Sequence, residues 1–457
     1  MTSNNPQTAQ PNIFERPSRP MELDWYSSDE RMDSAVRDLL AKLNVRGHQN
    51  NLIRYLRVIL AAVLKSYKSN PNRYISYGRN SDFLTCRYKG KADPRNPERL
   101  DARKIIEIVD ALKAIGFVES HTGGYGYAEE GHIGRLSRFK VTERFVSFIK
   151  GHKLLDIQLK QKPINGGMVL KDEKKKLIYD YSAYEGNSRI QRSKDILAAY
   201  NDLIANTTIK LEHQEHFRPI DFSRICTWRV FHNSSFELGG RFYGNWWMNG
   251  CKSEDRRYIS INGQPTVELD YKANHLYMLY GLYNVDMPEE LRNDPYKFHK
   301  YIPREVAKAI FTRLMNCQSQ RGAWLSIEEA KEKEDNEELK MELRQRIKGQ
   351  SYFDNYVVEM LRAHPLLKTE ICINKGLELM NWDSKIAEYV IRRMTALGIP
   401  VLCVHDSFII DSKYKHILRH FMKKAYSSFN IPKGLPEIKE TVSLLKLDQD
   451  GVIRVIE

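Results

Sequence analysis

Two aspartates, Asp270 and Asp406, stand where short hydrophobic segments end. Asp270 follows the β-type run that begins at Val267, and Asp406 follows the apolar run that begins at Ile399. A carboxylate is costly to bury at a strand end unless a cation or hydrogen bonds compensate for its charge. If the two converge, they can hold two Mg²⁺ ions, with Mn²⁺ as an alternative, in the arrangement used for in-line phosphoryl transfer. The competing interpretation is that each aspartate only caps a turn.

A helix predicted from Arg304 to Asn316 supplies the third part of this pattern. Arg304, Lys308 and Thr312 follow one another at intervals of four residues, as does Asn316, so they lie on one face of the helix. A cation pair one turn apart, followed by smaller polar groups, suits a bound triphosphate with its sugar and base beyond it. Taken alone, the same spacing is typical of a charged surface helix.

The elements around the aspartates must position them. A helix is predicted over 273–282, directly after Asp270. A returning strand over 408–410 places His405, Asp406 and Ser407 at the tip of a hairpin. The two aspartates are 406 − 270 = 136 residues apart, so only the tertiary fold can bring them together.

The N-terminal part of the chain has a different pattern. Residues 1–22 are polar and contain four prolines, which predicts a flexible tail. Apolar residues three and four apart over 105–115 predict a helix that ends at Gly116. A short strand, a glycine-rich turn over 121–134, a returning strand and another helix follow.

This order is typical of a winged helix-turn-helix, which we expect over residues 23–152. Arg135 and Arg138 stand where such a module contacts DNA phosphates. The alternative is a small α+β module used for protein contacts. A linker and a helical, thumb-like segment are expected over 153–215.

Length and composition agree with several domains and an anionic partner. The chain has 457 residues and a formal charge of 72 − 58 = +14, which favours binding to a polyanion. Its six cysteines are scattered without metal-ligand spacing, so we expect no disulfide framework and a reducing, cytoplasmic setting. We expect no membrane-spanning segment, because the longest purely apolar helical run has seven residues, 58–64.

These motifs, in this order, resemble the palm and fingers of the family A polymerases, which comprise the DNA polymerase I family and the single-subunit phage-type RNA polymerases. The stretch from Asp270 to His275 resembles motif A, Arg304 and Lys308 resemble the start of motif B, and the stretch from Val404 to Ser407 resembles motif C. The resemblance covers roughly residues 220–425. It also includes the following segments: Gly239 to Phe242, Arg256 to Ile259, and the helix that contains Asp383, Val390 and Leu397.

The resemblance implies an antiparallel palm sheet and helical fingers over 216–457. Together with the N-terminal winged helix, the expected fold is α+β. It implies that Asp270, Asp406 and the Tyr271 carbonyl hold two Mg²⁺ ions. Arg304, Lys308 and Thr312 bind the triphosphate, and Lys308 can also protonate the leaving group. The resemblance assigns contacts with the nucleic acid to these residues: Arg241, Arg256, Arg257 and His405. Two alternatives remain: Arg241 forms a structural ion pair, and His405 is only a turn residue.

Three departures from the family pattern bear on function. Ser407 replaces the last carboxylate of the DNA polymerases but matches the RNA-polymerase form. His275 replaces the motif A glutamate, and its bulk would crowd a ribose 2′-hydroxyl, which favours deoxynucleotides. Asn316 and Cys317 replace the usual Tyr-Gly at the end of motif B.

The sequence therefore predicts a template-directed nucleotidyltransferase. Its first interpretation is a small DNA polymerase without proofreading, of a kind suited to a phage, plasmid or other mobile element, acting on DNA primer–template and nucleoside triphosphates. One alternative is an RNA polymerase or primase of the same fold. Another is a catalytically inactive replication-initiator protein that binds DNA. The sequence gives no oligomeric state.

Overall fold

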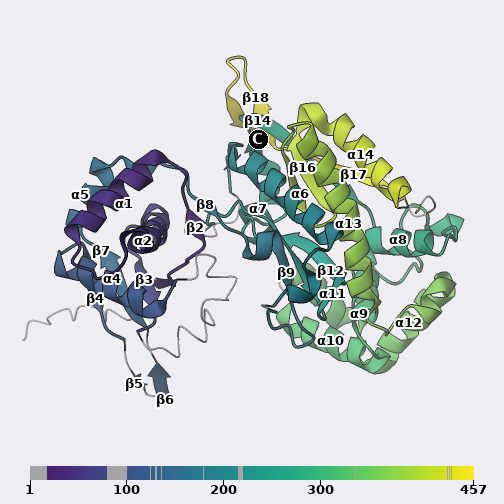
Figure 1. Ribbon diagram of the computed structural model, residues 1–457. Coiled ribbons are helices and arrows are strands. Elements are labelled where there is room, and N and C mark those ends of the chain that lie inside the picture. Colours follow the sequence, from purple (N-terminus) through teal and green to yellow (C-terminus); the bar gives the residue numbers. More distant parts are fainter. Residues whose placement is uncertain are drawn as a thin grey trace, which may run out of the picture. The chain divides into compact units, whose positions relative to one another are not determined.

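The computed structural model describes residues 18–79, 100–123, 125–128, 131–134, 136–178, 180–214, 220–334, 336–429, 431, 433 and 435–456. The chain forms two compact units of mixed helix and strand, coloured by sequence in Figure 1. The first comprises residues 1–166 and 221–226, and the second comprises 167–220 and 227–457. No helix in the described ranges combines the length and apolarity that a bilayer crossing requires.

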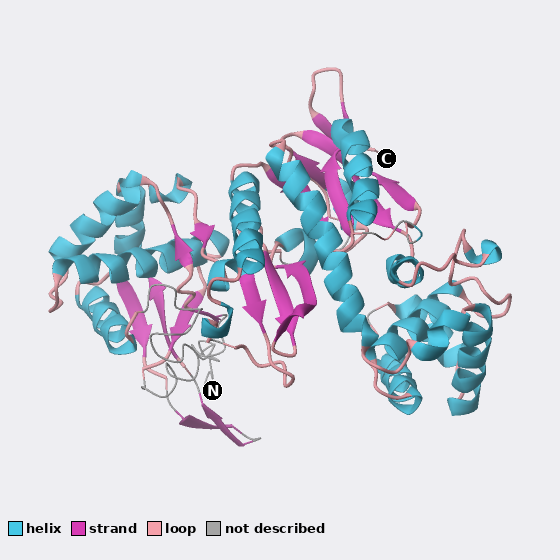
Figure 2. Ribbon diagram, turned by 45° about the vertical axis from the view of Figure 1, so that its right-hand side comes forward, coloured by secondary structure: helices cyan, strands magenta, loops and turns pink. Residues whose placement is uncertain are grey.

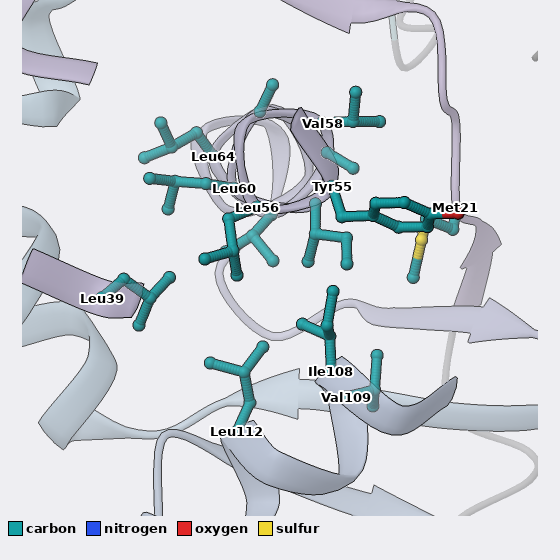
Figure 3. Packing of buried hydrophobic residues seen from close by; sticks show 14 of the residues in the cluster. Met21, Leu39, Tyr55, Leu56, Val58, Leu60, Leu64, Ile108, Val109 and Leu112 are labelled. Carbon is teal, nitrogen blue, oxygen red and sulfur yellow. The ribbon is translucent and has the colours of Figure 1, made fainter. Parts of the chain in front are cut away.

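The first unit is built around the long helix α2. Its helices are α1 (Glu30–Lys42), α2 (Gln49–Ser69), α4 (Ala102–Ala114) and α5 (Glu143–Gly151). Its strands are β1 (Ser18–Pro20), β2 (Trp25–Tyr26), β3 (Tyr74–Tyr77), β4 (Val118–His121), β5 (Tyr125–Ala128), β6 (Gly131–Gly134), β7 (Ser137–Val141) and β8 (Lys160–Gln161). Figure 3 shows the core, where Leu56 and Leu60 of α2 face Ile108 and Leu112 of α4.

The sheet of this unit has the order β1-β3-β7-β4. Helix α4, strand β4 and strand β7 occupy the residues for which the sequence predicts a helix and two strands. The assignment of residues 23–152 as a winged helix stays a prediction. Arg135 lies outside the described residues, and Arg138 is a buried residue of β7.

The predicted flexible tail, residues 1–22, extends too far. Ser18–Pro20 pairs in parallel with β3, and the Met21 backbone N–H donates to the Ser76 carbonyl oxygen at 2.9 Å. Met21 is also buried in the core (Figure 3). The composition of this segment is polar, but backbone pairing and one apolar side chain are enough to fix it against the sheet.

The second unit joins an antiparallel sheet to helices. Its strands are β9 (Met168–Leu170), β10 (Ile209–Leu211), β11 (Trp228–His232), β12 (Ser235–Tyr243), β13 (Ile259–Ile261), β14 (Gln264–Tyr271), β15 (Val401–Val404), β16 (Ser407–Asp411), β17 (Ile438–Val442), β18 (Leu445–Leu447) and β19 (Ile453–Val455). Its helices are α6 (Ser188–Ala205), α7 (Trp246–Asn249), α8 (Asn274–Leu282), α9 (Arg304–Asn316), α10 (Gln320–Lys333), α11 (Glu337–Arg346), α12 (Gln350–Ala363), α13 (Lys375–Ala396) and α14 (Lys415–Ser428).

The main sheet has the order β10-β13-β14-β16-β15, and β17 also pairs with β14. Helix α13 runs through the unit and packs against β12, α6 and α14 (Figure 1). Helices α9 to α12 form a separate helical group next to the strands, which are magenta in Figure 2. This group and the sheet provide two walls between which a site can form.

The predicted linker region, 153–215, contains ordered structure. Strand β9 is buried and pairs in parallel with β11, so Met168–Leu170 belongs to the second unit. Residues 221–226, predicted to begin the palm, belong instead to the first unit. Asp221 is held there by Lys65 Nζ at 2.6 Å and by Arg19 at 2.7 Å. These long-range ion pairs leave no signal in local composition.

Candidate active site

The two aspartates are brought together by the pairing of β14 with β16. Asp270 lies opposite Ser407 in the antiparallel register. Asp406 is the residue directly before Ser407, in the turn between β15 and β16. His405, in the same turn, has a left-handed φ of 58°, which allows the chain to reverse there. The hairpin tip predicted from the sequence therefore carries Asp406 to the end of the strand that holds Asp270.

Both aspartates line one pocket of about 820 Å³. Its walls come from β14, from helix α9, from α13 and from strand β17. The pocket contains eight of the residues predicted from the sequence: Arg241, Asp270, Tyr271, His275, Arg304, Lys308, Thr312 and Asp406. The residues predicted to hold metal and triphosphate thus share a single cavity.

Helix α9 presents its polar face to the pocket. Lys308, Thr312 and Asn316 line the cavity together with Arg304, while the opposite face, which includes Ile310, is buried in the helical group. The helix follows Pro303, whose fixed φ is compatible with a helix start. The intervals of four residues seen in the sequence therefore become one lining surface.

The two cations of α9 differ in their surroundings. Arg304 Nε donates to Asp294 at 2.9 Å, and its guanidinium lies 5.4 Å from the centre of the Tyr296 ring. The positive charge of Lys308 is felt by Asp270, where it partly offsets the causes that raise the pKa of that carboxyl. Arg304 is consequently a positioned cation, whereas Lys308 faces the carboxylate pair.

Burial raises the pKa of Asp270 to about 7, and the negative charges of Asp406 and Glu268 add to this effect. Lys308 and Lys439 oppose it. A carboxyl with like-charged neighbours in a partly buried cavity gains from any cation that binds there. The electrostatics of the pocket therefore favour a divalent ion.

The donor set suits Mg²⁺ only in part. Two carboxylates and a backbone carbonyl at Tyr271 are hard oxygen ligands of the kind that Mg²⁺ prefers. The Tyr271 side chain is engaged elsewhere, since its hydroxyl donates to the Met422 carbonyl at 2.7 Å. Within the described residues there is no group of three or more His, Cys, Asp or Glu that could hold a metal. Mg²⁺ commonly uses one or two carboxylates and completes its shell with water and substrate phosphates, so these residues fit an ion that arrives with a nucleotide.

Asp383, a residue to which the sequence gave no role, organises one wall of this pocket. Its carboxylate Oδ2 accepts a hydrogen bond from Arg241 Nε at 2.8 Å and lies 3.0 Å from His275 Nε2. Arg241 also lies 3.0 Å from the same His275 nitrogen. The Asp383 side chain is only 1% exposed, and its two partners hold its pKa below the usual value despite burial. Arg241 thus forms an internal ion pair with Asp383, which is the alternative stated for it in the sequence analysis.

The clearest signal for Asp383 in the sequence is an interrupted apolar stripe. Three polar residues, Asn381, Asp383 and Ser384, lie on the buried side of α13. Buried polar groups in a helix need partners, and here the partners include residues of β11, β12 and α8.

The remaining predicted contacts lie outside the pocket lining. Arg256 forms a two-contact ion pair with Glu268, at 3.0 and 3.1 Å, and Arg257 is exposed, with its Nε donating to the Val442 carbonyl at 3.3 Å. His405 packs edge-on against the Tyr243 ring at 5.3 Å.

His405 keeps one unused polar atom. Its Nδ1 is buried and makes no hydrogen bond among the described residues. Burial and the nearby charge of Arg241 lower its pKa, so the ring is held neutral next to the carboxylate pair.

Ser407 forms a hydrogen bond to a residue of the neighbouring strand. Its hydroxyl donates to Glu268 Oε1 at 2.6 Å, so the serine that replaces the motif C carboxylate ties β16 to β14. Lys439 of β17 was not predicted, yet it pairs with Asp270 across the sheet and lines the pocket. Its strand joins the sheet from a distant part of the chain, so no local pattern indicates its role.

Comparison with known proteins adds a distant structural likeness. No protein-family model and no curated protein matches the chain. Among solved structures, the chain is similar to the POL domain of Pol1 from M. smegmatis in complex with DNA primer-template and dNTP. The identity is 12% and the TM-score 0.30, over 92% of this chain and 67% of that chain. The function proposed below rests on the pocket and not on this likeness.

Proposed function

We propose that this protein is a template-directed nucleotidyltransferase, in the form of a small family A-like DNA polymerase without proofreading. The observation that carries the proposal is the single pocket in which Asp270 and Asp406 face the cationic helix α9. Two carboxylates opposite a lysine and an arginine are the charges that a metal-bound triphosphate needs.

The pocket residues have distinct roles in the proposed nucleotide transfer. Asp270, Asp406 and the Tyr271 carbonyl would hold two Mg²⁺ ions, which would supply Lewis-acid activation of a primer 3′-hydroxyl and neutralisation of charge on the leaving pyrophosphate. Arg304 and Lys308 bind the triphosphate, and Lys308 donates a proton to the leaving group.

Sugar and nucleic acid are bound around these groups. Thr312 lies one turn beyond Lys308 on the same face and contacts the nucleotide. His275 crowds the ribose 2′ position, and His405 lies beside the primer terminus. Arg241 guides the nucleic acid from its fixed position on Asp383. Further contacts with the nucleic acid, outside the pocket, are proposed for Arg135, Arg256 and Arg257, whereas the burial of Arg138 in β7 rules out the contact predicted for it.

Two other functions remain in competition with this one. An RNA polymerase or primase is favoured by the His405-Asp406-Ser407 sequence, which matches the RNA-polymerase form of motif C. A catalytically inactive replication-initiator protein is compatible with the basic charge of +14, but it gives no reason for the carboxylate pair.

A primer-extension assay separates the three functions. The full chain is given a primed DNA template and Mg²⁺, with dNTPs and NTPs offered in separate reactions. We expect extension with dNTPs. Extension with NTPs alone identifies an RNA polymerase or primase, and DNA binding without any extension, in Mg²⁺ or Mn²⁺, identifies the inactive protein. Either result overturns our first choice.

A further inference from the structure

Helix α13 carries an aromatic and cationic stripe on the side that faces away from the pocket. Tyr389 follows Met380, a pocket residue, by nine residues, which is about two and a half turns of helix. The two side chains therefore point to opposite sides of α13. On the Tyr389 side lie Trp382, Lys385, Arg392 and Arg393, none of which is buried.

The aromatic members of this stripe form a row. Trp382 and Tyr389 are seven residues apart and so share one face of the helix. The ring of Phe429, which follows α14, lies 6.3 Å from Trp382 and 6.5 Å from Tyr389. All three rings are half-buried, so each is fixed on one side while part of it remains accessible.

Cations lie against these rings. Lys385 Nζ is 4.8 Å from the centre of Trp382 and is also paired with Glu237 at 3.0 Å. The guanidiniums of Arg392 and Arg393 are 5.5 and 5.2 Å from the centre of Tyr389. Cations placed this way are attracted by the ring faces, so the stripe holds positive charge close to accessible aromatic surface.

The arginines of this stripe are not neutralised within the described chain. Arg392, Arg393 and the neighbouring Arg192 of α6 make no ion pair with a carboxylate of the described residues. Partial burial lowers the pKa of Arg392, and the charges of Arg393 and Arg192 lower it further. The carboxylate of Glu388 also acts on Arg392, but it is bound to the buried Arg229. Three unneutralised guanidiniums gain from an anion that spans them.

We propose that this surface, the α13 stripe, binds single-stranded nucleic acid. It is defined by Trp382, Lys385, Tyr389, Arg392, Arg393, Phe429 and Arg192. The cations match a phosphate backbone, and aromatic side chains stack on bases that have no pairing partner. A duplex keeps its bases stacked inside and would use only the cations, so the row of rings points to an unpaired strand. This function goes beyond nucleotide transfer and uses no residue of the pocket.

Direct binding tests this proposal with the full chain. Fluorescence anisotropy is measured with fluorescein-labelled oligo(dT) of about 20 nucleotides, which exceeds the roughly 4–16 nucleotides that one such surface covers, and with a duplex of the same length. The test variant is Arg192→Gln/Arg392→Gln/Arg393→Gln. The matched control, Lys333→Gln/Arg344→Gln/Arg362→Gln, removes the same charge from exposed positions that are paired with glutamates.

We expect the test variant to bind oligo(dT) at least about tenfold more weakly, and its log–log salt slope to flatten by about 2, since each neutralised phosphate of a single strand contributes about 0.7. The control variant should stay within about twofold of the wild type. Trp382→Leu should weaken oligo(dT) binding by at least about fivefold, the loss expected for one stacked base, and leave duplex binding unchanged.

Cross-linking of the wild-type protein locates the bound strand without any variant, so it also applies if a variant fails to fold. Oligonucleotides that contain bromodeoxyuridine are cross-linked to the wild-type protein by light, and the attached peptides are identified by mass spectrometry. We expect cross-links at Trp382, Tyr389 or Phe429. Cross-links only elsewhere overturn the proposal.

Other outcomes also overturn it. If the test variant binds oligo(dT) as tightly as the wild type, the arginines do not contact the strand. If its affinity for the duplex falls as much as its affinity for oligo(dT), the surface binds double-stranded DNA. Competition by polyglutamate as strong as that by unlabelled oligo(dT) identifies an acidic protein as the partner. None of these measurements needs catalysis, so failure here and failure of the proposed function are separate results.

Discussion

Burial and the negative charge of Asp406 raise the pKa of Asp270 to about 7, although 136 residues separate the two aspartates in the chain. The pairing of Asp270 with Ser407 accounts for this proximity, because Asp406 directly precedes Ser407. Among the described residues no third acidic ligand joins these two carboxylates in a metal-holding group, which leaves coordination positions for water and phosphate.

The first prediction concerns pH and magnesium. A carboxyl whose folded-state pKa is raised from 3.8 to about 7 binds its proton more tightly in the folded state, so its contribution to stability is lost as the pH rises between about 4 and 7. Asp270→Asn removes this penalty. We expect the variant to be more stable than the wild type at pH 8 by roughly 2–4 kcal/mol, with little difference at pH 4, as measured by urea unfolding without metal.

Mg²⁺ should reduce the free-energy cost of ionising Asp270 in the folded protein. Because a cation favours the ionised carboxylates, we expect Mg²⁺ to raise the melting temperature of the wild type more at pH 8 than at pH 5, and to have little effect on Asp270→Asn. Asp286→Asn is the control, since Asp286 is 62% exposed and pairs with Lys433. An equal response of all three proteins to Mg²⁺ would refute the shared-cation site.

The second prediction concerns Lys308. Lys308→Gln removes a charge-assisted contact to the triphosphate, and we expect the KM for nucleotide to rise by about tenfold or more. The kcat should also fall, because the variant lacks the proton donor. Arg313→Gln on the same helix is the control: Arg313 lies 3.6 Å from Glu334 and does not line the pocket. Nucleotide kinetics that are the same for both variants would contradict this role.

The third prediction concerns sugar choice at His275. His275→Ala opens the space that the imidazole occupies beside the pocket, so ribonucleotides should be accepted more readily. We expect the ratio of kcat/KM for a dNTP to that for the matching NTP to fall at least about tenfold. His299→Ala is a control outside the pocket, where the imidazole lies tilted against the Tyr301 ring with the ring centres 5.6 Å apart. A constant ratio in His275→Ala would show that another group senses the sugar.

The fourth prediction concerns Asp383, which holds Arg241 and His275. Asp383→Asn leaves a largely buried guanidinium without its counter-charge, and we expect a loss of about 3 kcal/mol in the free energy of unfolding at pH 7. The pKa of Asp383 is lowered in the folded protein, so its stabilisation is present above its usual pKa and is lost as the pH falls through the lowered value. Urea titrations at pH 7 and at lower pH measure this.

The exposed pair of Asp286 with Lys433 provides the comparison for Asp383. Removing its charge in Asp286→Asn should change stability by less than about 1 kcal/mol. A loss for Asp383→Asn as small as this would mean that Arg241 is stabilised by other groups.

Local patterns were enough to predict the parts of the pocket that lie on single elements. The spacing of Arg304, Lys308 and Thr312 defines one face of α9, and the apolar runs before Asp270 and Asp406 define strand ends. Each of these features depends on a periodicity of a few residues, which the sequence displays directly.

Features that depend on distant pairing were not predictable in the same way. Asp383 meets Arg241 across 142 positions, and Lys439 reaches the pocket because β17 joins β14. Likewise, residues 18–20 are a strand only because β3 is available to pair with them. In each case the partner lies far away in the chain, so even where a local pattern marks the residue, as for Asp383, it does not identify the partner.

The most direct test of the central claim is the single-turnover rate of nucleotide incorporation by Asp270→Asn and Asp406→Asn, with the wild type and Asp286→Asn alongside. If the two carboxylates share the metal ions of transfer, each pocket variant should lose at least about 100-fold in rate, since each removes several kcal/mol of charge stabilisation. The control should keep the wild-type rate. Incorporation at the wild-type rate by either pocket variant would contradict the claim.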